Sequence, residues 1–150
     1  MAAQKPEFFP TDVHHSLPMA LLRARESVMR RYRPMLEAHG VNEQQWRVLR
    51  VLAEEDQLDA SEVAARANIL APSLTRMIRS MVDKDLIERG RDDGDGRRVM
   101  LKITPAGLQV IRTASPESRR IYREIEAQFG HDRMALLVDL LNDLSVLDAG

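Results

Sequence analysis

The spacing of apolar positions predicts a chain that begins with two long helices. From Ser16 to Gly40, apolar side chains recur at helical spacing, which predicts an N-terminal helix that ends at the glycine. Pro34 lies inside this run, so we expect a kink there. Asn42 is suited to cap a second helix, whose core face includes Trp46.

Two shorter helices are predicted next. Asp59 and Glu62 have the spacing of a capping box and stand at the start of a helix over residues 60–67. After a brief turn, another helix begins near Pro72. Its apolar positions fall on one face: Leu74, Met77, Ile78, Met81 and Val82. Two helices joined by a tight turn form a helix-turn-helix, in which the second helix reads DNA.

After Asp85 the apolar period changes from helical to alternating. Residues 99–103 alternate apolar and polar positions, which predicts a half-buried strand, and residues 86–91 supply its partner. The aspartate- and glycine-rich segment 92–96 then forms the hairpin tip. The ribbon is therefore predicted to be a wing next to the helix-turn-helix.

The C-terminal part is predicted to be helical again. Thr104 and Pro105 are a good cap and first helical residue for a long helix, which we expect Pro116 to bend or briefly break. A last helix over residues 132–147 has a large apolar surface for its position. This surface predicts burial against another chain.

Composition narrows the classes of function. The sequence holds 22 basic and 23 acidic residues, a net charge of −1, so only the local distribution of charge can support nucleic-acid binding. There is no cysteine, which excludes disulfides, thiolate metal sites and cysteine-based sensing. No apolar run approaches the ~20 residues that cross a bilayer, and no secretion signal is evident, so we expect a cytoplasmic protein without a membrane partner.

The candidate DNA contacts lie on the helix from Pro72 and on the wing. That helix has no evident side-chain cap, so its first N–H groups are free to meet a phosphate. The expected contacts on its outer face are Ser73, Thr75, Arg76 and Arg79. In the wing, Arg97 can enter the minor groove while Asp95 fixes its guanidinium, and Arg98 lies beside them. Ordinary solvated charge is the alternative interpretation for both elements.

A second group of residues is suited to an aromatic carboxylate. It combines an aromatic wall with cationic and hydroxyl groups, and its members are His14, Arg23, Ser27, Trp46 and Arg50. The competing interpretation places the tryptophan in the core and the arginines on the surface or at a dimer contact. The histidines do not have metal-ligand spacing. A calcium loop starting at Asp93 would need glutamate where Thr104 stands. We therefore expect no metal, no cofactor and no catalytic residues.

These motifs together resemble the multiple antibiotic resistance regulator (MarR) family of winged-helix transcription factors. The resemblance runs from about Ser16 to the C-terminus. It is carried by EQQWRVL at 43–49, PSLTR at 72–76, LIER at 86–89, the Asp95-x-Arg97 wing and LKITPAG at 101–107. Residues 16–26 and 69–73 further resemble repressors of homoprotocatechuate degradation operons. The resemblance implies a homodimer that binds a pseudo-palindromic operator in double-stranded DNA, with a phenolic acid as effector.

The expected fold is therefore mainly α (α+β), a winged helix-turn-helix with terminal helices for homodimerisation. We expect an arm and dimerisation helix at 1–40, a DNA-binding region at 41–104 and dimerisation helices at 105–150. The expected function is repression of an aromatic catabolic operon, relieved by a phenolic acid. Three alternatives remain open: a regulator of another pathway, a winged-helix protein-interaction module, and a small helical enzyme or ligand carrier.

Overall fold

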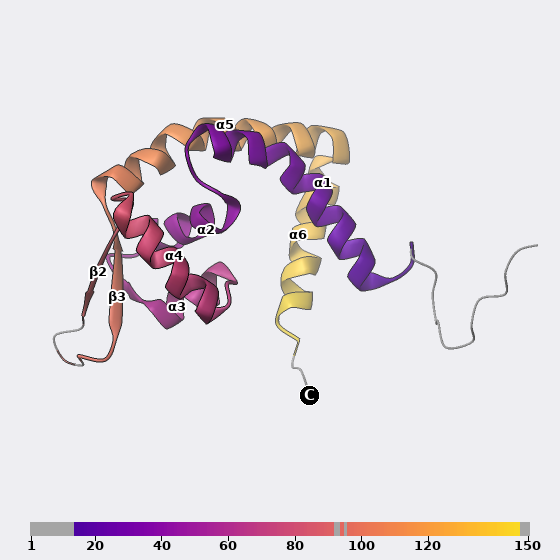
Figure 1. The fold of residues 1–150 in the computed structure, drawn as a ribbon. Helices are drawn as coiled ribbons and strands as arrows, with labels where there is room; N and C mark the ends of the chain where they lie inside the picture. The colour runs from indigo at the N-terminus through magenta and orange to yellow at the C-terminus, as the bar shows by residue number, and fades with distance from the viewer. Residues whose placement is uncertain (1–13, 92–93, 95, 148–150) are drawn as a thin grey trace, which may run out of the picture.

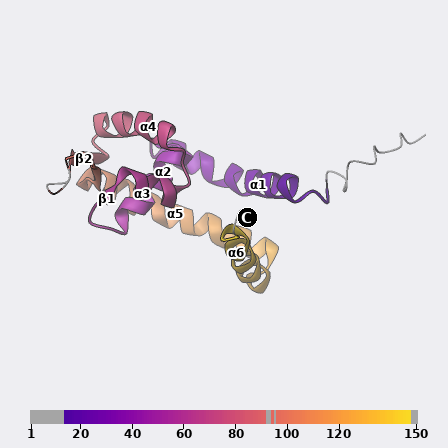
Figure 2. The ribbon, with the colours of Figure 1, turned by 90° about the horizontal axis from the view of Figure 1, so that it is seen from below.

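The computed structural model describes residues 14–91, 94 and 96–147. Helices α1 (Leu17–Ala38) and α5 (Pro105–Phe129) pack together, and α6 (His131–Ser145) turns away from the end of α5 (Figure 1). The remaining elements form a compact lobe under one end of α5. Both α1 and α5 extend from this lobe toward the same side (Figure 2). The terminal helices thus lie beside the lobe rather than around it.

Local hydrogen bonds explain where the helices of the lobe begin. Helix α2 (Glu43–Ala53) starts with a complete capping box, in which the Asn42 side chain accepts from the Gln45 N–H at 2.8 Å and the Gln45 side chain accepts from the Asn42 N–H at 3.0 Å. Helix α3 (Ala60–Ala67) is capped by Asp59 as predicted, but only this half of the expected capping box forms, because the Glu62 carboxylate lies by Arg66. It ends at Asn68, whose φ of 54° is left-handed and turns the chain toward α4 (Ala71–Asp83).

The predicted amphipathic face of α4 is confirmed. Leu74, Ile78 and Met81 are buried in the core, and Met77 and Val82 pack against it. This face joins the apolar sides of α2 and α3 and one side of the sheet in a single core. The opposite face of α4 is left to solvent.

The wing is an antiparallel ribbon of β2 (Ile87–Arg91) and β3 (Val99–Ile103), as predicted. A third strand, β1 (Leu58–Asp59), pairs with the other edge of β3 and gives the order β1-β3-β2. The sequence did not predict β1. A two-residue strand has no period of its own and exists here because β3 offers a free edge.

The long helices run through their internal prolines without a break. Helix α5 is one element across Pro116, so of the two expected outcomes, a bend or a brief break, the break does not occur, and α1 likewise continues past Pro34. Ala114 and Ile121 are buried on either side of Pro116. Packing on both sides holds the two halves of α5 together despite the missing hydrogen bond.

The first turn of α5 is closely bound to the lobe. Thr104 caps it by accepting from the Gly107 N–H at 3.0 Å, and its hydroxyl donates to the Asp85 carbonyl at 2.6 Å. A Cβ on Gly107 would lie 2.3 Å from the Leu86 carbonyl oxygen, so this backbone contact requires glycine. The wing and α5 therefore meet at a rigid joint.

Candidate nucleic-acid interface and ligand groove

The exposed face of α4 carries the residues expected to contact DNA. Its N-cap residue, Leu70, provides no side-chain hydrogen bond, so the first N–H groups of the helix are open to an anion. Thr75, Arg76 and Arg79 are exposed and Ser73 is half-buried. The Thr75 hydroxyl donates to the Ala71 carbonyl at 3.1 Å and keeps its lone pairs for an outside donor.

A shallow hollow of about 350 Å³ lies along the C-terminal half of this face. It is lined by Arg76, Arg79, Ser80, Asp83 and Lys84. Three cations and one carboxylate give the hollow a net positive charge. Such a surface attracts the phosphate backbone of a nucleic acid.

The wing supplies further cations beside the sheet. The Arg91 Nη1 donates to the Gly96 carbonyl at 2.7 Å across the hairpin, which fixes the base of the tip. Arg97 is exposed close to it. Asp95, the expected partner of Arg97, lies outside the described residues. The described part of the wing thus presents arginines at the end of the ribbon farthest from α5 (Figure 1).

Arg98 has a structural partner that the sequence did not indicate. Its Nη2 lies 2.7 Å from Oδ2 of Asp59, while Oδ1 of the same carboxylate accepts from the Glu62 N–H at 2.8 Å. The backbone hydrogen bond from Glu62, followed by that from Arg98, holds the pKa of Asp59 below its ordinary value. One carboxylate therefore joins the wing to the start of α3.

A groove between α1, α2 and α5 is the second candidate site. Two adjoining hollows, of about 400 and 210 Å³, share the side chains of Tyr32, Arg50 and Ser118. Trp46 lines the smaller hollow and Tyr122 lines the larger one. The groove therefore combines aromatic walls with a guanidinium, which suits an aromatic acid.

The polar groups of the groove are suited to an anion. Burial, and then the neighbouring phenol of Tyr122, raise the pKa of Tyr32 above its ordinary value, whereas Arg50 acts in the opposite direction. Tyr32 consequently keeps its proton near neutral pH and can donate it in a hydrogen bond. Within the described ranges, no carboxylate forms an ion pair with Arg50.

The structure brings together only two of the five residues expected at the ligand site. Trp46 and Arg50 line the groove. Ser27 accepts from Arg31 through both its carbonyl and its hydroxyl, on the exposed side of α1. Arg23 donates to the His14 carbonyl at 3.4 Å, near the end of α1 that extends away from the lobe. These three residues do not line the groove of their own chain.

Several lining residues escaped the sequence analysis. Tyr32 and Tyr122 follow the apolar period of their helices, which is typical of core positions, although Tyr122 is 42% exposed. Ser118 belongs to no motif, and Glu43 belongs to the EQQWRVL motif, which indicated no role in ligand binding. Only the packing of α1 and α5 against α2 brings these positions to one groove.

Comparison with known proteins identifies the family. A model of the MarR family matches residues 39–98. Over 135 residues the chain is 38% identical to the homoprotocatechuate degradative operon repressor of Escherichia coli, covering 90% of this chain and 91% of that protein. The chain belongs to the MarR family.

Two further MarR-family relatives agree with this assignment. The transcriptional regulator FarR of Neisseria gonorrhoeae is 37% identical, covering 90% of this chain and 92% of FarR. The crystal structure of NadR in complex with 4-hydroxyphenylacetate is 37% identical, with a TM-score of 0.79, and covers 93% of this chain and all of that one. The winged helix-turn-helix predicted from the sequence is thus confirmed. Among the described residues of this MarR-family chain, no helix is long and apolar enough to cross a membrane.

Proposed function

We propose that this protein is a homodimeric, sequence-specific DNA-binding regulator that represses an aromatic catabolic operon until a phenolic acid binds. The observation that carries the proposal is the presence of two separate sites in one chain. The cationic face of α4 and the wing are exposed, and the groove at Trp46 and Arg50 lies between α1, α2 and α5, where the lobe meets the long helices. The names of the relatives, a homoprotocatechuate operon repressor and NadR bound to 4-hydroxyphenylacetate, support the same class of effector.

DNA binding is proposed to follow the winged-helix mode. The N-terminus and outer face of α4 enter the major groove, where Arg76 and Arg79 reach base edges and Ser73 donates to phosphate; Thr75 donates to phosphate when its hydroxyl turns from the Ala71 carbonyl. Arg97 enters the adjacent minor groove. Arg98, held by Asp59, orients the wing in this arrangement and supplies charge rather than sequence readout.

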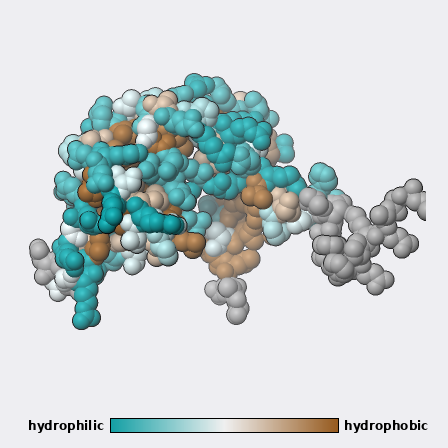
Figure 3. All heavy atoms as spheres, viewed as in Figure 1, coloured by the Kyte–Doolittle hydropathy of each residue, from teal (hydrophilic) through white to brown (hydrophobic). Residues whose placement is uncertain are grey.

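Dimerisation is proposed to use the terminal helices. On α6, only Met134 is buried, while a row of leucines stays exposed (Figure 3). The first half of α1 is also apolar and exposed: Leu17, Met19, Leu21 and Leu22. A second copy of the chain would cover both surfaces. It would also bring a partner's α1 near the groove, the route by which His14, Arg23 and Ser27 would reach a ligand.

Relief of repression by the ligand then follows from thermodynamic linkage between ligand binding and DNA binding. In a dimer, the two α4 helices bind successive major grooves only at a spacing of roughly 34 Å. A phenolic carboxylate held by Arg50 next to Trp46 lowers operator affinity if it binds better to a dimer with a different spacing. The division into 1–40, 41–104 and 105–150, a non-enzymatic role and a cytoplasmic location are part of this proposal.

The decisive experiment is a fluorescence-anisotropy titration on the native upstream DNA and on a scrambled duplex. It is run at two salt concentrations, with and without 3,4-dihydroxyphenylacetate. We expect specific, salt-sensitive binding that the acid weakens. Specific binding that ignores the acid removes the effector and leaves a regulator of another pathway. No preference for the native duplex favours a protein-interaction module instead.

A further inference from the structure

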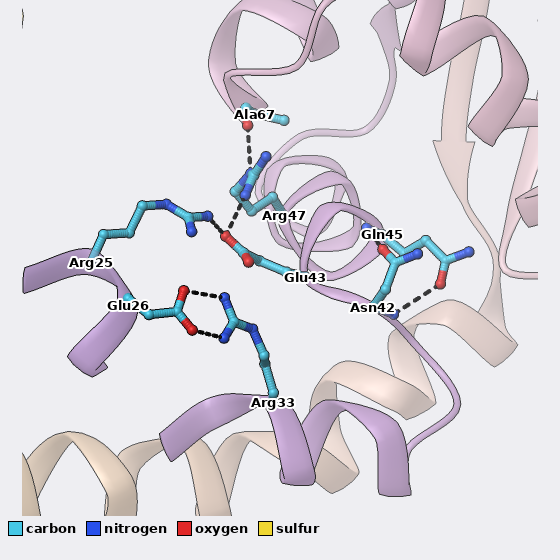
Figure 4. Close-up of polar contacts among 8 residues, drawn as sticks. All are labelled: Arg25, Glu26, Arg33, Asn42, Glu43, Gln45, Arg47 and Ala67. Atoms are coloured by element: carbon cyan, nitrogen blue, oxygen red, sulfur yellow. Dashed lines mark hydrogen bonds and ion pairs between the residues drawn. The ribbon is translucent and has the colours of Figure 1, made fainter. Parts of the chain in front are cut away.

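An ion-pair cluster lies where α1, α2 and α3 meet (Figure 4). Glu43, in the first turn of α2, accepts from Arg47 Nη1 at 2.8 Å, and the same carboxylate oxygen pairs with Arg25 from α1. The side chains of Glu43 and Arg47 are only 19% and 31% exposed. The Arg25 side chain is 50% exposed, so the cluster is only partly shielded from water, and its charges interact somewhat more strongly than a fully exposed pair.

Arg47 has a second contact that extends the cluster toward the reading helix α4. Its Nε donates to the carbonyl oxygen of Ala67 at 2.7 Å. Ala67 is the last residue of α3, whose final carbonyls have no partner within the helix, and it is 2% exposed. Without Arg47, this buried carbonyl would lose its hydrogen bond.

The Ala67 carbonyl stands directly before the turn that places α4. Asn68 follows in the left-handed conformation, and α4 begins three residues later at Ala71. The N–H groups of Asn68 and Ile69 are bound to carbonyls of α3, and Ala67 and Ile69 are buried in the core. Arg47 adds a side-chain hydrogen bond from α2 to this segment, which sets the position of the α4 N-terminus.

The same arginine lines the ligand groove. Glu43, Arg47 and Arg50 all border the hollow that contains Trp46. Arg47 and Arg50 are three residues apart on α2 and therefore project to neighbouring places. A carboxylate bound at Arg50 adds negative charge next to the Arg47 guanidinium, where it competes with the Ala67 carbonyl.

We infer that Arg47 is a positioning residue that transmits ligand occupancy of the groove to α4. When the groove is empty, Arg47 holds the α3–α4 turn through Ala67 and keeps the DNA-contacting face in its binding orientation. An aromatic carboxylate draws the guanidinium toward the groove, and the turn loosens. This inference rests on the proposed function, which supplies the two ligands that Arg47 would couple.

The test uses Arg47→Lys and a matched control, Arg33→Lys. Lysine keeps the charge but carries all its donors on one nitrogen, so it lacks the separate Nε and Nη1 with which arginine serves Ala67 and Glu43. Arg33 also makes two contacts to one carboxylate, Glu26, but within α1 and remote from the α3–α4 turn. Arg47→Gln serves as a second variant, and circular dichroism verifies folding.

Operator affinity is measured with and without saturating 4-hydroxyphenylacetate, and calorimetry measures acid binding without DNA. We expect the acid to weaken operator binding of the wild type by about 5- to 150-fold, the usual range of allosteric coupling. In Arg47→Lys the acid should still bind, while the ratio of the operator dissociation constants with and without acid falls to within about twofold of unity. Arg33→Lys should keep the wild-type ratio. A wild-type ratio in both Arg47 variants overturns the inference.

Hydrogen exchange separates failure of this inference from failure of the proposed function. If the wild type binds operator and the acid has no effect, the phenolic effector is wrong. The role of Arg47 is then judged on exchange at Asn68 and Ile69 and on operator affinity in the absence of acid. Faster exchange with weaker operator binding in Arg47→Lys, but not in Arg33→Lys, supports a positioning role. Unchanged exchange and affinity refute it.

Discussion

The Asp59 carboxylate accepts a hydrogen bond from Arg98 Nη2 at 2.7 Å, across 39 residues of sequence. Asp59 is at once the cap of α3 and part of β1, and Arg98 directly precedes β3. The pair therefore fixes the wing relative to the helix-turn-helix. Their relative position decides whether α4 and the wing can enter adjacent grooves together.

Asp59→Asn should lower thermal stability in a pH-dependent way. Asparagine still caps a helix but carries no charge for Arg98. The folded-state pKa of Asp59 lies below its ordinary value of 3.8. The stability that the Asp59 carboxylate contributes is therefore complete above pH 3.8, and it is lost as the pH falls through the lowered folded-state pKa. Melting temperatures of wild type and variant should differ at pH 7 and converge in acid. A gap that does not narrow in acid contradicts this account.

Arg79→Ala should weaken operator binding and relax its specificity. Loss of an arginine that reads a base edge costs about 1–3 kcal/mol at that position. Anisotropy titrations against duplexes changed one base pair at a time provide the measurement. Arg120→Ala is the control, because Arg120 pairs with Glu124 at 2.6 Å on the exposed side of α5. Equal losses for both variants would indicate a general charge effect only.

Arg50→Gln should reduce the affinity for phenolic acids. A hydrogen bond to a charged group contributes about 1.5–3 kcal/mol, so the dissociation constant should rise about 10- to 150-fold. Calorimetry with 4-hydroxyphenylacetate measures the change directly. Operator binding without the acid should stay at the wild-type level. Undiminished acid binding by the variant would place the carboxylate elsewhere.

Gly107→Ala should destabilise the fold. The new methyl group would overlap the Leu86 carbonyl oxygen and the Ile103 side chain, and neither lies at the end of a flexible chain. Overpacking of this kind costs about 1–3 kcal/mol. Urea denaturation gives the free energy of unfolding. Gly90→Ala, where an added Cβ meets nothing within 4 Å, is the matched comparison and should behave nearly as the wild type.

Leu136→Asp combined with Leu140→Asp should dissociate the proposed dimer. Both side chains are exposed in the single chain, at 59% and 55%, so the change does not disturb its own core. Charges buried at a dimer contact would cost more than the contact gains. Light scattering after size-exclusion chromatography gives the mass. A variant that remains dimeric places the interface on other residues.

Local chemistry explains which elements could be predicted from the sequence. The helix caps at Asn42, Asp59 and Thr104 depend on side chains next to the helix they start, and all three form as expected. The apolar face of α4 follows from its period alone. These features require no knowledge of distant parts of the chain.

Features made by distant segments could not be predicted in the same way. Strand β1 forms only because β3 offers a free edge, and the Arg98 contact with Asp59 depends on that pairing. Tyr32 and Tyr122 share the period of core residues, so only the packing of α1 on α5 reveals that they line a groove. The break expected at Pro116 fails for a similar reason, since buried neighbours outweigh the lost hydrogen bond.

The unbroken course of α5 has a mechanical consequence. Its 25 residues connect the base of the wing, where Gly107 packs against the Leu86 carbonyl, to the helices proposed for dimerisation. At 1.5 Å per residue the helix is a lever arm of ~37 Å, so tilting it by about ten degrees at one end displaces the other by about 6 Å. A small rotation beside α6 is thereby amplified at the wing into a shift comparable to the rise of two base pairs. The spacing of operator half-sites that the proposed dimer can bind would therefore depend on the stiffness of this single helix.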